Sequence, residues 1–260
     1  CGGEGASNMT SIGTGYDLYS TTFSPEGRIF QVEYAGKAVE NSGTIVAART
    51  KDGCVIAVEN LTHSKMLEPG ALRRVHRVAP HLGMSVAGLL ADSRQIVSRA
   101  RSEARQYKNF YGHAMPVKML NSRLSSFIQF YTLHDAARPF GCASIVAGYD
   151  DKGPQLYMIE SSGVSWGYFG TAIGKAKASA KTELEKLKLD QMTAREAAVE
   201  LAKIIYTVHD SVKDKNFELE MGWICDESDK KFTNVPDELL EEAKQKAKEH
   251  VSEGVLSSDE

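Results

Sequence analysis

One segment near the N-terminus constrains the fold of this chain more than any other. Ser24 followed by Pro25 is typical of a helix start, because serine caps a first turn and proline lacks the N–H that would stay unpaired there. The pattern predicts a helix over residues 25–41. At about 100° per residue, its polar residues fall in one sector of about 100°, and its apolar residues spread over most of the remainder. Either this is an interior helix or a neighbouring molecule covers part of it.

Beyond this segment, short β-prone runs and amphipathic helical patterns follow one another. Runs at 44–49 and 54–58 are joined through Asp52-Gly53, a strong hairpin signal. The other predicted strands are 84–90, 142–149, 155–160, 164–170, 217–225 and 231–235. The other predicted helices are one capped by Asp92 and ended by Gly112, then 117–131, 175–188, 193–210 and 237–251. Hairpins flanked by paired helices favour an α+β fold, namely a four-layer αββα sandwich of two antiparallel sheets between helix layers.

Composition narrows the functional classes. The chain has 260 residues, of which 42% are hydrophobic and 25% charged, as is ordinary for a globular protein with a normal core. A net charge of −3 gives no reason to expect a nucleic-acid partner. No apolar run approaches the roughly 18 residues that cross a bilayer, and no signal-peptide pattern is found. We therefore expect no membrane association and a location in the cytoplasm and nucleus.

The spacing of cysteines and histidines does not suggest a metal or redox site. Cys1, Cys54, Cys142 and Cys225 lie far apart in sequence, so we expect buried free thiols rather than disulfides. The histidines do not show the spacing of metal ligands. We expect neither a metal nor a cofactor.

Several segments resemble one family. Residues 15–17, 23–28 and 31–35 (GYD, FSPEGR and QVEYA) closely resemble the N-terminal signature of proteasome alpha subunits, and the likeness continues along nearly all the chain. The resemblance implies the N-terminal-nucleophile hydrolase fold, which is the αββα sandwich described above. It also implies that the helix over 25–41 packs between neighbours in a heptameric ring. The expected partners are six other alpha subunits, the beta-ring subunits, and regulatory-particle ATPases or other activators.

The same resemblance shows where catalytic residues would lie. Catalytic beta subunits carry a threonine at the start of the first strand, whose own amine is the base, with an Asp on the second strand and a Lys beyond it. The matching positions here hold Gly43, Glu59 and Val75. Gly43 has no hydroxyl, and exposing Thr44 as a new terminus would remove the N-terminal helix. We therefore expect no catalytic residue and a non-catalytic alpha-ring subunit; the alternative is a stand-alone amidohydrolase of the same fold.

A gate cluster is also implied by the resemblance. Tyr16, Asp17, Pro25 and Tyr34 match the residues that hold the N-terminal tails when the axial pore of the ring is open. Tyrosine hydroxyls, a carboxylate and a turn-setting proline suit a switch between order and disorder. Leu18 stands where most alpha subunits place Arg. Because of this difference, the resemblance does not determine how much this chain contributes to gating.

A docking pocket for activators is the second implied site. In the family, C-terminal carboxylates of activators bind between adjacent alpha subunits, in a pocket that usually contains a lysine. The matching residues here are Arg74, Gly88 and Leu89. Arginine also binds carboxylates, but with a different reach and geometry. Arg74 is predicted either to receive an activator tail or to be an exposed cation, and the sequence does not identify the activators or the ring neighbours.

The termini complete the division of the chain. We expect residues 1–24 to form a flexible extension and gate tail, and 25–235 to form the αββα domain. Residues 236–260 are expected to form a charged, solvated helix and, beyond Ser252, a disordered acidic tail. Residues 1–8 are either a natural extension or a remnant of expression. Ser257 is a candidate phosphorylation site because acidic residues follow it.

Overall fold

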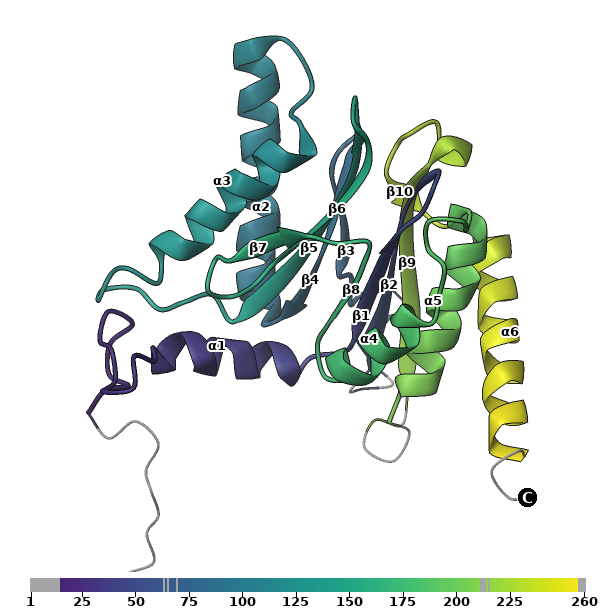
Figure 1. The fold of residues 1–260 in the computed structure, drawn as a ribbon, viewed down its shortest axis with the longest axis horizontal. Coiled ribbons are helices and arrows are strands. Elements are labelled where there is room, and N and C mark those ends of the chain that lie inside the picture. The colour runs from purple at the N-terminus through teal and green to yellow at the C-terminus, as the bar shows by residue number, and fades with distance from the viewer. Residues whose placement is uncertain are drawn as a thin grey trace, which may run out of the picture.

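The computed structural model describes residues 15–256, apart from 63, 65, 69, 211–213 and 215, with side chains as far as Ser252. Two five-stranded sheets lie face to face, and helices cover the outer side of each (Figure 1). The predicted αββα sandwich is therefore confirmed. Within the described residues, no helix combines the length and apolar character needed to cross a bilayer.

Both sheets are antiparallel throughout, with strand orders β10-β9-β2-β1-β8 and β3-β4-β5-β6-β7. The first sheet contains β1 (Ile45–Arg49), β2 (Gly53–Leu61), β8 (Gly170–Ile173), β9 (Phe217–Cys225) and β10 (Thr233–Asn234). The second contains β3 (Val75–Ala79), β4 (Leu82–Gly88), β5 (Cys142–Asp150), β6 (Gly153–Ile159) and β7 (Ser165–Gly167). The hairpin predicted at Asp52-Gly53 joins β1 to β2, and the Thr50 N–H donates to the Gly53 carbonyl at 2.8 Å.

Two strand predictions were wrong. Residues 164–170 do not form one strand, because β7 pairs with β6 in the second sheet whereas β8 pairs with β1 in the first. The crossing residues Tyr168 and Phe169 are aromatic and β-prone, so the sequence shows no break there. Strand β3 was missed because Val75 is buried but its neighbours His76 and Arg77 are basic, which hides the strand pattern.

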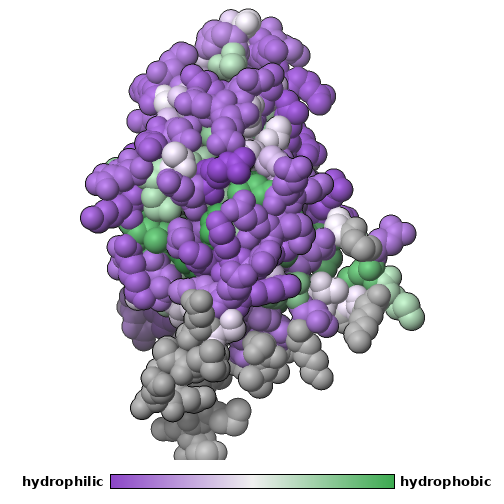
Figure 2. All heavy atoms as spheres, turned by 90° about the vertical axis from the view of Figure 1, so that its right-hand side faces the viewer, coloured by the Kyte–Doolittle hydropathy of each residue, from purple (hydrophilic) through white to green (hydrophobic). Residues whose placement is uncertain are grey.

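The described residues form α1 (Phe30–Glu40), α2 (Leu90–Tyr111), α3 (Val117–Phe130), α4 (Lys177–Glu185), α5 (Ala194–Val208) and α6 (Asp237–Leu256), and a short 3-10 helix η1 (Asp226–Ser228). Helices α2 and α3 cover the second sheet, and α4 and α5 cover the first (Figure 1). Helix α6 packs on α5, and the outer face on that side of the molecule is mainly hydrophilic (Figure 2). Helix α1 lies across the end of the sandwich and contacts β4 and β5.

Three apolar layers hold the molecule together. One lies between the two sheets, one between the second sheet and α2 and α3, and one between the first sheet and its helices. The stripe Leu239, Ala243 and Ala247 of α6 is fully part of the last layer. One face of α6 therefore belongs to the core, and its charged residues face water.

The N-terminal helix starts later than predicted. The Ser24 hydroxyl accepts a hydrogen bond from the Arg28 N–H at 3.1 Å, and its carbonyl accepts one from the Gly27 N–H at 2.8 Å. Gly27 has a φ of 77°, in the left-handed region. Residues 24–28 therefore form a closed turn, and α1 begins at Phe30 instead of Pro25.

Two other helix ends also differ from prediction. Asp92 lies inside the first turn of α2 and does not cap it, because its carboxylate binds the Arg138 guanidinium. Helix α6 continues to Leu256 instead of ending near Val251. The Ser252 hydroxyl donates to the Glu249 carbonyl at 2.7 Å, which lets a serine continue the helix. The disorder expected beyond Ser252 was thus wrong for 253–256, and Ser257 lies outside the described residues.

One aromatic ring connects the two sheets. Phe232, which is 1% exposed, lies against Gly83 of β4 and Gly222 of β9. A Cβ atom would meet the ring at 2.1 Å on Gly83 and at 2.9 Å on Gly222. Both positions therefore need glycine, and the ring occupies the space that their side chains would fill.

Candidate functional site

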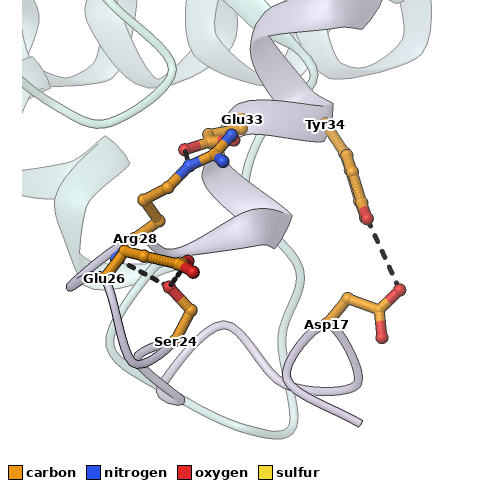
Figure 3. Close-up of polar contacts among 6 residues, drawn as sticks. All are labelled: Asp17, Ser24, Glu26, Arg28, Glu33 and Tyr34. Carbon is orange, nitrogen blue, oxygen red and sulfur yellow. Dashed lines mark hydrogen bonds and ion pairs between the residues drawn. The ribbon is translucent and has the colours of Figure 1, made fainter. Parts of the chain in front are cut away.

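The predicted gate residues come from α1 and from the segment before it. The Tyr34 hydroxyl donates to Asp17 Oδ2 at 3.5 Å, the long end of hydrogen-bond distance (Figure 3). The Gln31 side-chain amide donates to the Asp17 carbonyl. Burial and the negative charge of Asp17 raise the pKa of Tyr34. The first turns of α1 thus hold the Asp17 loop through two side chains, of which Gln31 was not predicted.

The other two predicted gate residues lie at the surface. Tyr16 is 43% exposed and Pro25 is exposed in the turn 24–28. That turn is fixed to α1 by the Arg28 guanidinium, whose Nε donates to Glu33 Oε1 at 2.7 Å (Figure 3). The structure therefore brings Asp17 and Tyr34 together and leaves Tyr16 and Pro25 accessible. Leu18 is 71% exposed beside them.

The three predicted docking residues line one pocket of about 310 Å³. Arg74, just before β3, and Gly88 and Leu89, just before α2, share this pocket with residues from the end of α1 and from β2. The remaining lining residues are Ala38, Asn41, Ser42, Gly43, Asn60, Leu61, Leu72 and Leu90. The sequence prediction therefore grouped residues that are neighbours in space.

Arg74 points across this pocket. Its Nη1 donates to the carbonyls of Val86 at 3.0 Å and Gly88 at 3.1 Å. Burial lowers the pKa of Arg74, and the nearby Glu220 carboxylate opposes that shift. Gly88 has a φ of 109°, and a Cβ there would meet the Gly141 carbonyl oxygen at 2.2 Å, so bare backbone forms this wall.

Glu220 of β9 holds the backbone at Arg74, and the sequence prediction missed it. Its carboxylate accepts hydrogen bonds from the N–H groups of Arg74 at 2.9 Å and Val75 at 3.3 Å. It also accepts one from Asn60 Nδ2 at 2.8 Å. Burial raises the pKa of Glu220, although these hydrogen bonds favour its charged form. Alternation of Glu with apolar residues along β9 is usual for a half-exposed strand, so nothing in the sequence marked Glu220.

At the strand start that matches a catalytic threonine, the backbone amide is already hydrogen-bonded and there is no space for a side chain. The Thr44 N–H donates to Glu59 Oε2 at 2.8 Å, and His209 Nδ1 donates to Glu59 Oε1 at 2.6 Å. A Cβ on Gly43 would meet the Glu59 carbonyl oxygen at 2.0 Å. Val75 is buried in the layer between the sheets. The carboxylate near this position thus binds a backbone amide and an imidazole, a role of His209 that the sequence did not reveal.

The described part of the chain contains no group of three or more His, Cys, Asp or Glu side chains placed to hold a metal ion. Cys54, Cys142 and Cys225 are buried free thiols, as predicted, and Cys1 lies outside the described residues. Burial raises the pKa of Cys54 and of Cys142 to about 12. These thiols stay protonated near neutral pH and are poor nucleophiles.

Comparisons with known proteins agree with this geometry. Residues 39–224 match the family model "Proteasome subunit", and residues 16–38 match the model for the N-terminal signature of A-type proteasome subunits. "Proteasome subunit alpha type-3" of Arabidopsis thaliana is 60% identical over 94% of this chain and 98% of that protein. The protein of the same name from Acanthamoeba castellanii is 59% identical, over 96% and 99%.

A more distant relative covers the chain almost as fully. "Probable proteasome subunit alpha type-7" of Saccharomyces cerevisiae is 46% identical over 90% of this chain and 83% of that protein. The signature match spans the Asp17 loop, the turn 24–28 and most of α1, and the family match runs from the end of α1 through all strands up to β9. The chain belongs to the proteasome alpha-subunit family.

Proposed function

We propose that this chain is a non-catalytic subunit of the outer alpha ring of the 20S proteasome core particle, in the alpha type-3 position. Its proposed partners are six other alpha subunits, the beta ring and regulatory particles, within ubiquitin- and ATP-dependent protein degradation. The observation that carries the proposal is the alpha signature over residues 16–38, which precedes the sandwich and forms the Asp17 loop, the turn and α1. The stand-alone amidohydrolase is not favoured.

The surface of α1 supports a role in ring contacts. Phe30, Ala35 and Val39 are buried against the sandwich. Val32 and Ala38, which belong to the same wide apolar arc, are only partly buried in the single chain. An apolar helix face that its own domain leaves partly open is suited to packing against neighbouring subunits.

The strand start supports the absence of catalysis. An N-terminal threonine nucleophile needs a hydroxyl and a free amine at the start of the first strand. In this chain Gly43 supplies no hydroxyl, and the Thr44 nitrogen is a backbone amide bound to Glu59. The matching lysine position holds Val75, which is buried and uncharged.

The two predicted sites complete the proposal. The Asp17 loop held by Tyr34, with Tyr16 and Pro25 beside it, would position the N-terminal tail at the pore. The pocket of Arg74, Gly88 and Leu89 would accept the C-terminal carboxylate of an activator. Support for this second role comes from the pocket volume and from the guanidinium that crosses it.

The test measures the size of the particle that contains the chain, and the intact mass of the chain, in cytoplasmic and nuclear fractions of cells. A tagged chain should co-purify in a particle of ring size that contains other proteasome subunits, with an intact mass that includes residues before Gly43. A stable folded monomer in place of this particle would argue against ring assembly. A chain trimmed to Thr44 with peptidase activity would support the hydrolase alternative instead.

A further inference from the structure

A positively charged groove lies apart from the sites described above, between β3 and α2. It has a volume of about 340 Å³ and is lined by His76, Arg94, Val97, Ser98, Arg101, Ser102 and Arg105. Arg94, Arg101 and Arg105 are separated by seven and four residues, so they lie within about 40° of one another on one face of α2. Along the helix axis the three residues form a row about 16 Å long, at about 1.5 Å per residue.

The row has no neutralising partner in the described part of the chain. The acidic residues of α2 are Asp92 and Glu103, and both bind cations elsewhere: Asp92 binds Arg138, and Glu103 binds Arg99 and Arg123. Among the groove arginines, Arg101 donates from Nε to the Arg77 carbonyl at 3.0 Å, which fixes its side chain along the groove. For Arg94 and Arg105 the described residues supply no ion-pair or hydrogen-bond partner.

The local potential is correspondingly positive. The pKa of His76 is lowered by burial and by the charges of Arg101, Arg74, Arg94 and Arg73. A strong positive field on a protein with a net charge of −3 is a local feature and not a consequence of overall composition. Burying uncompensated arginines against another protein would be costly unless that protein brings anions.

We infer that this groove binds an acidic peptide segment of a partner protein, whose carboxylates pair with Arg94, Arg101 and Arg105. Exposed guanidinium groups bind carboxylates bidentately, and the hydroxyls of Ser98 and Ser102 line the same groove. A row of about 16 Å matches about five residues of an extended peptide. The groove lining contains no Phe, Tyr or Trp on which a nucleic-acid base could stack, which favours a peptide over single-stranded RNA.

The test uses the full chain and a fluorescein-labelled hexaglutamate peptide, with hexaglutamine as the uncharged comparison. Fluorescence anisotropy should show binding of hexaglutamate that weakens as salt is raised, and no binding of hexaglutamine. The double variant Arg94→Gln/Arg105→Gln loses no ion pair or hydrogen bond within the described chain, so its fold should be unchanged. Adding Arg101→Gln should bring the total loss of affinity to about tenfold, as three exposed ion pairs are expected to contribute together.

A matched control removes two positive charges that do not line the groove. Lys118 and Lys248 are exposed on α3 and α6, and Lys118→Gln/Lys248→Gln should bind hexaglutamate as the unchanged chain does. Equal weakening in the control and in the groove variant would overturn the proposal, since only net charge would then matter. Tighter groove-dependent binding of tripolyphosphate or of an oligouridine RNA would overturn the assignment to a peptide. The measurement does not require ring assembly, so its failure would leave the proposed function standing.

Discussion

Asp92 accepts two hydrogen bonds from the Arg138 guanidinium, at 2.6 and 2.8 Å, and a third from the Gly141 N–H at 2.9 Å. The pair links the first turn of α2 to the segment that leads into β5. Gly141 in turn accepts a hydrogen bond from the Leu89 N–H at 2.9 Å. The Leu89 wall of the pocket around Arg74 is therefore linked through Gly141 to the Asp92 carboxylate.

Replacing this carboxylate should lower stability. Asp92→Asn is expected to reduce the free energy of unfolding by about 1–3 kcal/mol, because the buried Asp92 carboxylate loses its charge-assisted hydrogen bonds to Arg138, whose side chain is itself 63% exposed. The Arg138 hydrogen bonds lower the pKa of Asp92 in the folded protein. Its contribution is thus present above the ordinary Asp pKa and is lost as the pH falls through the lowered folded value. Urea unfolding at several pH values should show the two proteins converging in acid.

The control for this prediction is an exposed ion pair. Lys246→Gln breaks the pair with Glu242 on α6, and should leave the free energy of unfolding nearly unchanged because both side chains are solvated. If Asp92→Asn and Lys246→Gln cost the same, the buried Asp92 carboxylate contributes no more than a surface pair.

A side chain at Gly43 should disturb the strand start. Gly43→Ala places a Cβ at 2.0 Å from the Glu59 carbonyl oxygen, so we expect a loss of about 1–3 kcal/mol in unfolding free energy. Gly43→Thr should be at least as unstable and should show no peptidase activity. Gly36→Ala is the control: its Cβ meets nothing within 4 Å, and alanine in a helix should stabilise by about 0.5–1 kcal/mol. Thermal unfolding would measure the stability of the three variants, and peptide hydrolysis would measure the activity of Gly43→Thr. A stable and active Gly43→Thr chain would contradict the conclusion that this strand start has no space for a nucleophile.

Two adjacent arginines allow a matched test of the docking pocket. Arg74→Met should weaken binding of a peptide with a free C-terminal carboxylate by about tenfold, since a hydrogen-bonded charge pair is lost. The C-terminally amidated peptide should bind both proteins equally weakly. Arg73 is exposed and does not line the pocket, so Arg73→Met should have no effect. Binding to the assembled particle is the measurement, and equal effects of the two substitutions would exclude Arg74 as the receptor.

Removing the proposed gate tail should leave assembly intact. Deleting residues 9–22 is expected to change peptide entry only modestly, because six other tails would remain in the ring. Tyr34→Phe removes the hydroxyl that faces Asp17 and should have a smaller effect in the same assay. Peptide hydrolysis by purified particles measures entry, and native mass measures assembly. A ring that fails to form after the deletion would contradict the assignment of this segment to the pore.

The basic groove should make stability depend on pH. The folded pKa of His76 lies below its ordinary value, so the unfolded chain binds more protons between the two values. Stability is therefore complete above the ordinary His pKa and declines as the pH falls towards the folded one. In His76→Gln this decline should be smaller, as measured by urea unfolding between about pH 7 and about pH 5. An unchanged pH profile would show that neither burial nor the surrounding arginines lower the pKa of His76.

The sequence predicted the layers of the fold better than their edges. Periodicity identified α3 and α5 because each has a regular buried face, whereas β9 was identified as a β-prone run that is buried continuously over its second half. The turn at 24–28 was mistaken for a helix start, because Ser-Pro is favoured both in such turns and at helix starts. The hydrogen bond from the Arg28 N–H to the Ser24 hydroxyl distinguishes the turn from a helix start, and the sequence alone does not show it. The path of 164–170 depends on which sheet edge is available, which is tertiary information.

The candidate sites divide in the same way. Arg74, Gly88 and Leu89, which the resemblance groups, line one pocket, and their role as a docking site stays a prediction. Glu220 and His209 were not found, because each acts through a partner more than a hundred residues away in sequence. Such pairs leave no local pattern, and only folding brings them together.

The ring of Phe232 is packed between the two sheets. Because it fills the space left by Gly83 and Gly222, one sheet could slide over the other only if the ring first left this tightly packed position. The sandwich should consequently move as one stiff block. If an activator binds the pocket around Arg74, its effect on the rest of the ring would then be transmitted by tilting of the whole domain or by movement of the segment before Phe30. Shear between the two sheets would not transmit it.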